Sequence, residues 1–202
     1  FTAPGCACAW LHGMGDQPGG RLARFHCLLT NVASSMTGAS MYYQYLGRDV
    51  KVVSFVGDGA TVDIGFQALS AAAERGDTMI YICYDNEGYM NTGVQRSGST
   101  PFGARTTTTP VGKMRQGKEQ PSKYLPLIML FHGIPYVATA TIAYPEDYAQ
   151  KLTKAMKVKP GVAYIHLFLP CPTGWGFAED EGWALCRLAV ATNYFPLWEA
   201  EN

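Results

Sequence analysis

The chain has 202 residues, enough for one domain with a full core, and its 16 basic and 16 acidic residues cancel to a formal net charge of zero. This balance argues against a basic surface for nucleic acid and against an acidic disordered tail. Charged residues make up only 16% of the chain, against about 25% in an average soluble domain. The low share favours a subunit that hides part of its surface in an assembly.

The termini and the cysteines indicate the compartment. No apolar run approaches the ~18 residues of a membrane span, and the first residues lack the basic and apolar regions of a signal peptide. The chain does not begin with methionine, so we expect an N-terminal segment to be missing before Phe1. Six cysteines without a secretory signal favour a reducing compartment, where clustered thiols serve metal or redox chemistry. We therefore expect a cytoplasmic enzyme subunit.

The first half of the chain predicts a loop, a helix and a βαβ unit. Residues 1–20 are rich in Gly, Cys and Pro and predict a loop, and apolar residues recur at helical spacing over 21–45. A strand over 50–56, a helix over 64–75 and a strand over 78–84 follow. A strand, a crossover helix and a strand in this order predict parallel pairing of the two strands.

The second half begins with residues 86–121, which show no periodicity and are rich in Gly, Thr, Ser and Pro. A loop of this length is either functional or ordered by other parts of the molecule. Further predicted elements are helices over 122–131, 146–156 and 178–191 and strands over 136–140 and 162–169. We predict a single domain over 1–202, with a C-terminal tail from 170. Its fold class is α/β, a three-layer sandwich on a mostly parallel sheet.

Three of the predicted strands end in residues suited to ligand binding. Gly57-Asp58-Gly59 follows the first strand, Asp85-Asn86-Glu87-Gly88 the second, and Pro170-Cys171-Pro172 the last. Ligands of open parallel sheets bind beyond the carboxyl ends of the strands. The glycines beside Asp58 allow a phosphate to approach the backbone, and the start of the following helix supplies N–H donors.

Asp58 and Asn86 are residue types that hold Mg²⁺. Each supplies one hard oxygen, and a backbone carbonyl near Gly88 would complete the protein's share, because phosphate oxygens and water usually fill the other positions. Gly-Asp-Gly alone is also an ordinary tight turn. Its place between a strand and a helix, with Asn at the next strand end, favours a diphosphate held by Mg²⁺.

The same residues carry a resemblance to a known family. Gly57-Asp58-Gly59 followed by Asn86 resembles the thiamine diphosphate motif. Residues 84–97 (YDNEGYMNTGVQRS) are similar to the thiamine-binding β subunits of pyruvate:ferredoxin oxidoreductase and its 2-oxoacid relatives. Further similar stretches are 99–104 (STPFGA), 132–140 (HGIPYVATA), 170–175 (PCPTGW) and 194–197 (YFPL). The likeness extends from about residue 50 to the C-terminus.

The resemblance implies a role for each site residue. The Mg²⁺ ligands are Asp58, Asn86 and the Gly88 carbonyl. The residues that bind thiamine diphosphate are Gly57, Asp58, Gly59, Ile64, Asn86, Asn91 and Thr92. Asn91 is also the catalytic residue, because a side-chain amide facing the 2-oxoacid can donate to an oxygen on which negative charge develops.

The resemblance also implies a proximal 4Fe–4S cluster. The family binds it with a Cys-x-x-Cys pair, a Cys in a Gly-Cys step and the Cys of a Cys-Pro-Thr-Gly-Trp segment. Cys171 matches the last and Cys6 the Gly-Cys step, whereas the Cys-x-x-Cys pair is missing and Cys8 is a substitute candidate. Either the N-terminal segment is lost, which the missing methionine favours, or this chain binds the cluster differently or not at all.

The remaining cysteines and two histidines lie in apolar patterns. Cys27, Cys83 and Cys186 are expected to be small buried hydrophobic residues. His132 and His166 are expected to be hydrogen-bonded in the core or behind the site.

The family's reaction is the function that the resemblance implies. The cofactor attacks a 2-oxoacid and releases CO₂, electrons pass through the cluster to ferredoxin, and coenzyme A takes the acyl group. Pyruvate is the expected 2-oxoacid. The carboxylate that activates the aminopyrimidine belongs to a separate domain in this class, so we expect an α subunit as a partner, with γ and ferredoxin-like δ subunits. No nucleic acid and no membrane span are expected.

Three alternatives stay open. Other 2-oxoacids, among them 2-ketoisovalerate, oxalate and an aryl glyoxylate, would fit, since much of the acid pocket would belong to the α subunit; the direction, oxidation or CO₂ fixation, is also open. A non-redox thiamine diphosphate decarboxylase or synthase would share Asp58 and Asn86 but has no need of Cys171. A Mg²⁺–nucleotide module or a silent assembly subunit is the third, because Asp58 and Asn86 specify only Mg²⁺ and diphosphate.

Overall fold

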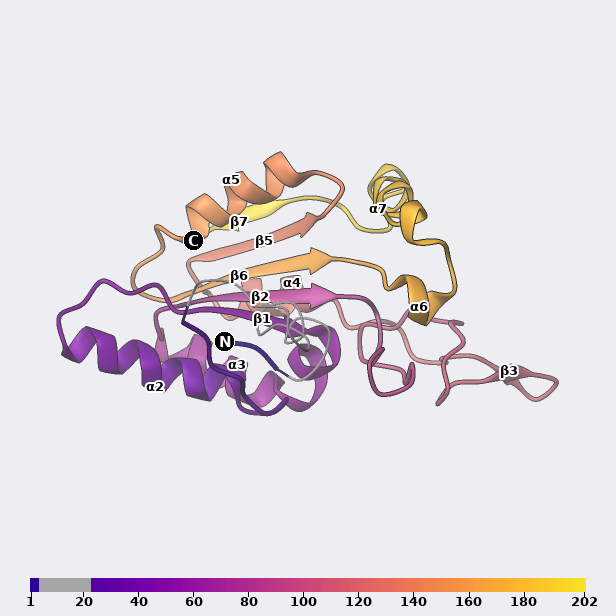
Figure 1. Ribbon diagram of the computed structural model, residues 1–202, viewed down its shortest axis with the longest axis horizontal. Coiled ribbons are helices and arrows are strands. Elements are labelled where there is room, and N and C mark those ends of the chain that lie inside the picture. Colours follow the sequence, from indigo (N-terminus) through magenta and orange to yellow (C-terminus); the bar gives the residue numbers. More distant parts are fainter. Residues whose placement is uncertain (4–22) are drawn as a thin grey trace, which may run out of the picture.

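The computed structural model describes residues 1–3 and 23–202, which build a five-stranded sheet in the order β1-β2-β6-β5-β7 (Figure 1). The strands are β1 (Val53–Gly57), β2 (Met79–Asp85), β6 (Val162–Phe168), β5 (Tyr136–Thr141) and β7 (Glu199–Glu201). The first four pair in parallel and β7 pairs antiparallel with β5. The predicted mostly parallel sheet, with β1 beside β2, is confirmed.

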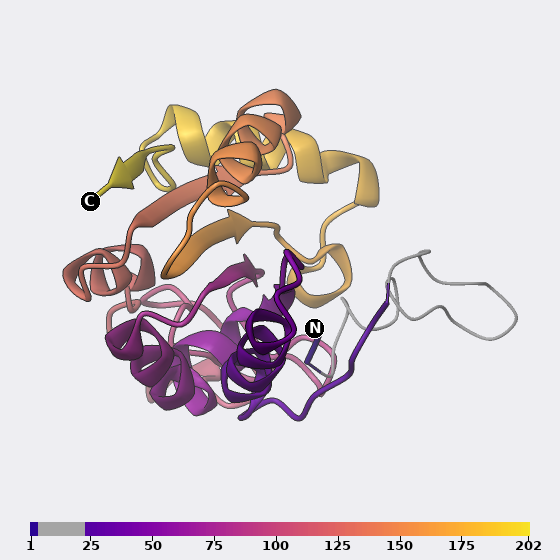
Figure 2. The same cartoon turned by 90° about the vertical axis from the view of Figure 1, so that its left-hand side faces the viewer.

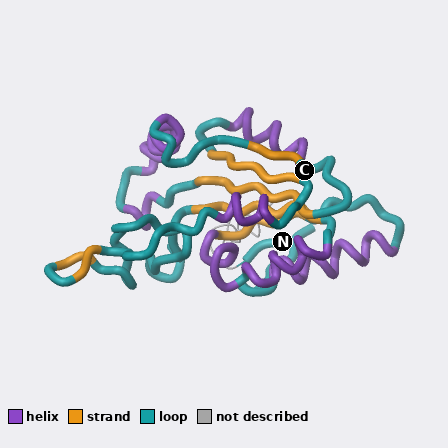
Figure 3. The backbone as a smooth tube through the Cα atoms, turned by 180° about the vertical axis from the view of Figure 1, so that it is seen from behind, coloured by secondary structure: helices purple, strands orange, loops and turns teal. Residues whose placement is uncertain are grey.

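Helices cover both faces of the sheet. One layer contains α2 (Val32–Tyr45), α3 (Phe66–Arg75) and α4 (Leu125–Phe131), and the other contains α5 (Pro145–Ala155). Figure 2 shows α2 and α3 across the sheet from α5, and Figure 3 shows α4 over the strands from behind. This is the predicted three-layer sandwich. A smaller apolar cluster joins α7 (Gly182–Ala191) to the end of β6.

The central strands are mostly apolar because both of their faces are covered. Every residue of β2, β5 and β6 is buried. Along β2, Tyr81 and Cys83 pack in the layer of α2 and α3, whereas Ile80 and Ile82 pack in the layer of α5. Continuous apolar runs of this kind are typical of parallel strands between two helical layers.

The helix predicted over 21–45 is shorter than expected, because α2 begins at Val32 and residues 23–31 are not helical. The backbone N–H of Thr2 donates to Phe25 O at 3.1 Å, and the N–H of Cys27 donates to Thr2 O at 2.8 Å. Thr2 also lies against Phe55 of β1. This backbone pairing with distant residues overrides the helical spacing of the apolar side chains.

The helix predicted over 64–75 differs at its start. A π-helical turn, η1 (Gly59–Ile64), precedes α3, which begins at Phe66. Gly65 joins the two, and its N–H donates to Ala60 O at 2.8 Å. A Cβ at Gly65 would lie 2.3 Å from that oxygen, so the junction needs glycine. The unpredicted turn directly follows Asp58.

Several short elements escape the sequence pattern. The long loop carries a hairpin of β3 (Val111–Gly112) and β4 (Arg115–Gln116), which projects beyond the carboxyl ends of the central strands (Figure 1). The C-terminal part contains three further short elements besides the predicted helix α7. They are α6 (Pro172–Trp175), a 3₁₀ turn, η2 (Glu179–Glu181), and β7. Such elements are too short for periodicity to predict. Among the helices of the described residues, none has the length and apolar character needed to cross a membrane.

Candidate functional site

The three unusual strand ends meet at one edge of the sheet. Because β1, β2 and β6 are neighbours and parallel, the residues that follow them lie side by side (Figure 1). A cavity of about 80 Å³ lies at this edge, between the ends of β1 and β2. Of the residues predicted to bind a cofactor, those that line it are Gly57, Asp58, Gly59, Asn86, Asn91 and Thr92, with Gly88 beside them. Ile64 does not line it, and this residue is 47% exposed at the end of η1.

Asp58 is a buried acid at the centre of this edge. Its Oδ2 accepts a hydrogen bond from the hydroxyl of Ser97, which is buried as well. Burial raises the pKa of the Asp58 carboxyl well above its usual value, the carboxylate of Asp85 raises it further, and the Ser97 hydroxyl opposes both effects. A cation at Asp58 would therefore relieve the repulsion between two buried carboxylates.

Oxygen-bearing groups converge beside Asp58. One terminal atom of the Asn86 amide lies 3.1 Å from Asp58 Oδ1 and 2.8 Å from Gly88 O. With the amide nitrogen at that position, Asn86 donates two hydrogen bonds; with the amide oxygen there, three oxygens face one another and need a cation between them. Neighbouring ligands of octahedral Mg²⁺ lie about 3 Å apart for Mg–O bonds of about 2.1 Å, which these separations match.

The donors also suit Mg²⁺ by type. The part of the chain that the structure describes holds no group of three or more His, Cys, Asp or Glu side chains placed to bind a metal. One carboxylate, one amide and one carbonyl form a different kind of site, which depends on phosphate oxygens and water for its remaining ligands. The residues present therefore fit Mg²⁺ bound together with a diphosphate.

Gly59 keeps the cavity wall free of a side chain. The hydroxyl of Tyr89 donates to Gly59 O at 2.8 Å, and a Cβ on Gly59 would lie 2.3 Å from the Tyr89 ring. Asn91 and Thr92 follow in an exposed turn, where the Thr92 hydroxyl donates to Gln95 Oε1 at 2.5 Å. The cavity is thus bounded by bare backbone on one side and by a hydrogen-bonded turn on the other.

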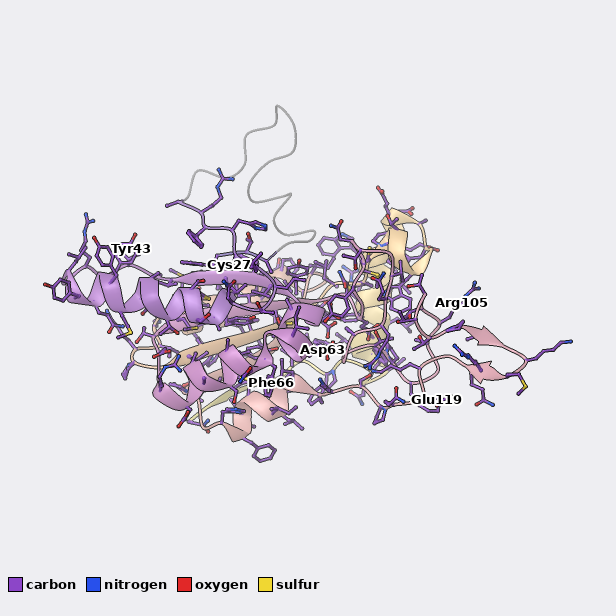
Figure 4. All side chains as sticks on the ribbon, turned by 90° about the horizontal axis from the view of Figure 1, so that it is seen from below. Cys27, Tyr43, Asp63, Phe66, Arg105 and Glu119 are labelled. Carbon is purple, nitrogen blue, oxygen red and sulfur yellow. The ribbon has the colours of Figure 1, made fainter. Side chains whose placement is uncertain are left out.

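The long loop is bonded to η1 by contacts that the sequence pattern does not predict. Asp63 is labelled in Figure 4. The N–H of Gly98 donates to its Oδ2 at 2.8 Å, and Lys123 Nζ lies 2.9 Å from its Oδ1. Ser97, on the same stretch, is the partner of Asp58. Its place in the family-like segment 84–97 is the signal that could have found it, whereas Asp63 has no such signal.

The two histidines are hydrogen-bonded, as expected. His132 Nε2 lies 2.8 Å from Ser70 Oγ and its Nδ1 lies 2.8 Å from Ile128 O. His166 is 3% exposed and lies between Asp85 and the Tyr164 hydroxyl, at 2.7 Å and 2.6 Å. His166 is thus placed behind the strand end that carries Asn86.

The cysteines divide into two groups. Cys27, Cys83 and Cys186 are buried free thiols, as predicted, and burial raises the pKa of each, which makes them unreactive. Cys171 is half-buried at the start of α6, where its Sγ accepts the N–H of Gly174 at 3.4 Å. Cys6 and Cys8 lie outside the described residues, so the cluster ligands stay a prediction.

Comparison with known proteins gives consistent similarities. The family model "Thiamine pyrophosphate enzyme, C-terminal TPP binding domain" matches residues 3–167. The chain is 55% identical to pyruvate synthase subunit PorB of Methanothermobacter thermautotrophicus over 183 residues, 90% of this chain and 63% of that protein. It is 48% identical to the NADH-dependent phenylglyoxylate dehydrogenase subunit beta of Aromatoleum evansii over 204 residues, 98% of this chain and 45% of that protein.

A solved structure is also similar. The 2-oxoglutarate:ferredoxin oxidoreductase from Magnetococcus marinus, solved with 2-oxoglutarate, coenzyme A and succinyl-CoA bound, superposes with a TM-score of 0.74 at 27% identity. The match covers 92% of this chain and 57% of that chain. The chain thus spans between 45% and 63% of the length of these relatives.

Proposed function

The chain belongs to the family of thiamine pyrophosphate enzymes, of which it contains the C-terminal TPP-binding domain, and from this we propose that it binds thiamine diphosphate with Mg²⁺ as a subunit of a 2-oxoacid:ferredoxin oxidoreductase. The observation that carries the proposal is the convergence of Asp58 Oδ1, the Asn86 amide and the Gly88 carbonyl. The similarity to two oxidoreductase subunits, of a pyruvate synthase and a phenylglyoxylate dehydrogenase, supports the reaction class.

Each residue of the site has a proposed task. Asp58, Asn86 and the Gly88 carbonyl hold Mg²⁺, which compensates the buried charge of Asp58 and Asp85. The other proposed cofactor contacts are Gly57, Gly59, Ile64 and Thr92. Thiamine diphosphate, when bound, supplies the nucleophilic carbon that makes decarboxylation of a 2-oxoacid possible. Asn91, exposed at the cavity, donates its amide to an oxygen of the 2-oxoacid and stabilises developing negative charge.

We propose pyruvate as the substrate, coenzyme A as the acyl acceptor and ferredoxin as the electron acceptor. The 55% identity to a pyruvate synthase subunit favours pyruvate, and the 48% identity to a phenylglyoxylate dehydrogenase subunit keeps an aryl glyoxylate as the alternative. A cavity of about 80 Å³ is small for such ligands, which supports completion of the pocket by an α subunit. We infer that γ and ferredoxin-like δ subunits join the complex in the reducing cytoplasm.

We also propose a 4Fe–4S cluster with Cys171 and Cys6 as ligands and Cys8 as a further candidate. Cys171 follows β6, which neighbours β2, so its backbone lies at the edge of the sheet where the cofactor is proposed to bind. The free thiol of Cys171, half-exposed at that edge, is accessible to a cluster.

Binding of thiamine diphosphate with Mg²⁺ to the purified complex, measured by calorimetry, tests the cofactor site. Asp58→Asn removes the carboxylate charge with little change of shape and is expected to weaken binding by at least roughly 100-fold, since loss of even an outer hydrogen-bonding partner costs 10–100-fold. Asp77→Asn, an acid paired with Arg75 away from the site, is the control that should leave binding unchanged. Normal binding to Asp58→Asn would contradict the site, and equal competition by ATP would favour a nucleotide module.

Anaerobic iron and sulfide analysis with EPR after dithionite tests the cluster in the same complex. Cys171→Ala is expected to remove about four irons and one reduced-cluster signal. Cys186→Ala, a buried thiol of α7, should leave the iron content unchanged. A native complex without iron would instead support the non-redox thiamine diphosphate enzyme.

A further inference from the structure

A chain of buried hydrogen bonds connects the interior of the sheet to the turn that carries Asn86 and Gly88. The Tyr164 hydroxyl lies 2.6 Å from His166 Nδ1, and His166 Nε2 lies 2.7 Å from Asp85 Oδ2. Asp85 Oδ1 in turn accepts the backbone N–H of Glu87 at 2.8 Å. Tyr164, His166 and Asp85 are 0%, 3% and 6% exposed, so water does not replace these bonds readily.

With a neutral imidazole, one arrangement of protons gives each polar side-chain atom in this series of hydrogen bonds a partner. The Asp85 carboxylate only accepts, so His166 Nε2 carries the proton and donates to it. Nδ1 is then an acceptor, and the Tyr164 hydroxyl donates to it. Each oxygen of Asp85 therefore accepts a hydrogen bond, one from His166 and one from Glu87.

The Asp85 carboxylate holds the backbone of the turn that follows it. Glu87 has φ of +65°, in the left-handed region that disfavours a residue with a side chain. Its N–H is bonded to Asp85 Oδ1, as in an Asx turn, and its carbonyl accepts the Thr100 hydroxyl at 2.5 Å. Because of this turn, the Asn86 amide and the Gly88 carbonyl reach the same point beside Asp58.

We propose that His166 is a positioning residue for the metal site: donation from its Nε2 fixes the Asp85 carboxylate, which holds the Asn86–Gly88 turn in the conformation that presents two ligands to Mg²⁺. This inference rests on the proposed binding of Mg²⁺ and thiamine diphosphate. His166 itself touches neither group. The requirement is for a donor at the position of Nε2; the bulk of the ring and the bond to Tyr164 are not sufficient.

Two substitutions separate the roles of the ring nitrogens. Gln at 166 places its amide near the position of Nε2 and can donate to Asp85, whereas the shorter Asn reaches only the position of Nδ1. We expect His166→Asn to weaken Mg²⁺ binding by about 10- to 100-fold, the effect of losing a partner that orients a metal ligand. His166→Gln should retain the affinity. The readout is the Mg²⁺ dissociation constant at saturating thiamine diphosphate, measured by calorimetry on the assembled complex together with its melting temperature.

Two further variants serve as controls. Tyr164→Phe removes the partner of Nδ1 and keeps the donor to Asp85, so its Mg²⁺ affinity should stay close to that of the unaltered complex. His132→Gln alters a histidine whose partners are Ser70 and Ile128, between α3 and α4, and should leave Mg²⁺ binding unchanged.

The outcomes distinguish this inference from the proposed function. If His166→Asn lowers the melting temperature but binds Mg²⁺ normally, or if His166→Gln loses affinity as strongly as His166→Asn, the positioning role is wrong. Asp58→Asn, measured in the same assay, reports on the site itself. Normal Mg²⁺ binding to Asp58→Asn overturns both proposals, whereas loss there with normal binding to His166→Asn overturns only the role of His166.

Discussion

At the scale of single residues, Gly59 is a position at which an added methyl group would collide with the Tyr89 ring beside the cavity. An added Cβ would lie 2.3 Å from the Tyr89 ring, closer than van der Waals contact permits. We expect Gly59→Ala to displace the ring and break the bond from the Tyr89 hydroxyl to Gly59 O. The unfolding free energy should fall by about 1–3 kcal/mol, as overpacking of a dense region does, in urea unfolding of the full chain.

Gly38 provides the matched control for this substitution. It lies on the exposed side of α2, with no atom within 4 Å of an added Cβ. Gly38→Ala is expected to raise the unfolding free energy by about 0.5–1 kcal/mol, because glycine in a helix costs that much in backbone entropy. If Gly59→Ala raised the unfolding free energy as Gly38→Ala is expected to do, crowding by the Tyr89 ring would not matter.

At the scale of elements, one buried lysine orders the long loop. Lys118 is 1% exposed, and its Nζ donates to Gly98 O at 3.0 Å and to Thr100 O at 2.5 Å. These carbonyls lie next to Ser97, the hydrogen-bond partner of Asp58. The ammonium group thus supplies the donors that a helix or sheet would give to a buried backbone.

Lys118→Met tests this role. The variant removes one of the two donors to each carbonyl, since Gly98 O keeps the N–H of Lys123 and Thr100 O keeps the hydroxyl of Ser122. Loss of the two hydrogen bonds from the charged ammonium group is expected to cost about 1.5–3 kcal/mol of unfolding free energy. Hydrogen exchange of the full chain should speed up over residues 97–104. Lys113→Met, at an exposed position of the hairpin, should leave exchange there unchanged. Equal exchange in the two variants would contradict the ordering role of Lys118.

The short strand β7 is held to α5 by a charged pair. Lys154 Nζ lies 2.5 Å from Glu199 Oε1, and the Tyr136 hydroxyl donates to Glu199 Oε2 at 2.6 Å. The hydrogen bond from Lys154 has the larger effect and that from Tyr136 the smaller, and together they hold the pKa of Glu199 below its usual value. A lowered folded pKa contributes stability above the unfolded pKa of about 4.3, and that contribution is lost as the pH falls through the folded pKa.

Glu199→Gln should therefore have a pH-dependent effect on stability. At neutral pH the variant is expected to lose about 0.2–1 kcal/mol of unfolding free energy, because the pair is partly exposed. The difference from the unaltered chain should shrink below about pH 4 in urea unfolding. Glu201→Gln, whose carboxylate lies 3.6 Å from Lys154, should change stability less. A loss that does not vary with pH would count against the charged pair.

At the scale of the whole molecule, the cavity at the edge of the sheet is much smaller than a usual ligand pocket. It measures about 80 Å³, whereas ligand pockets commonly span roughly 300–1,000 Å³. Large apolar side chains are exposed on several elements, among them Tyr45 on α2, Phe131 on α4 and Met114 beside β4. Together with the low share of charged residues, these features agree with a chain that other subunits complete.

The isolated full chain should accordingly bind thiamine diphosphate less tightly than the complex does. Failure to bury one ring-sized apolar group forfeits about 1.5–3 kcal/mol, which corresponds to about 10- to 100-fold in the dissociation constant. Calorimetry with Mg²⁺ in excess measures both constants. Equal affinities would mean that this chain alone forms the whole cofactor pocket.

The sequence by itself determined the central architecture and the chemistry of its edge. Continuous apolar runs identify β2 and β6 as strands buried on both faces, and the βαβ order makes β1 and β2 parallel neighbours. Parallel pairing then brings the residues after both strands, Asp58 and Asn86, to one edge. This part is predictable because periodicity and strand order reside in residues close together along the chain.

Only the tertiary structure decided which distant residues support that edge. Backbone pairing of Phe25 and Cys27 with Thr2 keeps these residues out of α2, which begins only at Val32. Ser97 contacts Asp58 from a loop without periodicity. His166 meets Asp85 although the two are 81 positions apart in sequence. Such contacts carry no local pattern, because they form where the folded sheet places the ends of its strands.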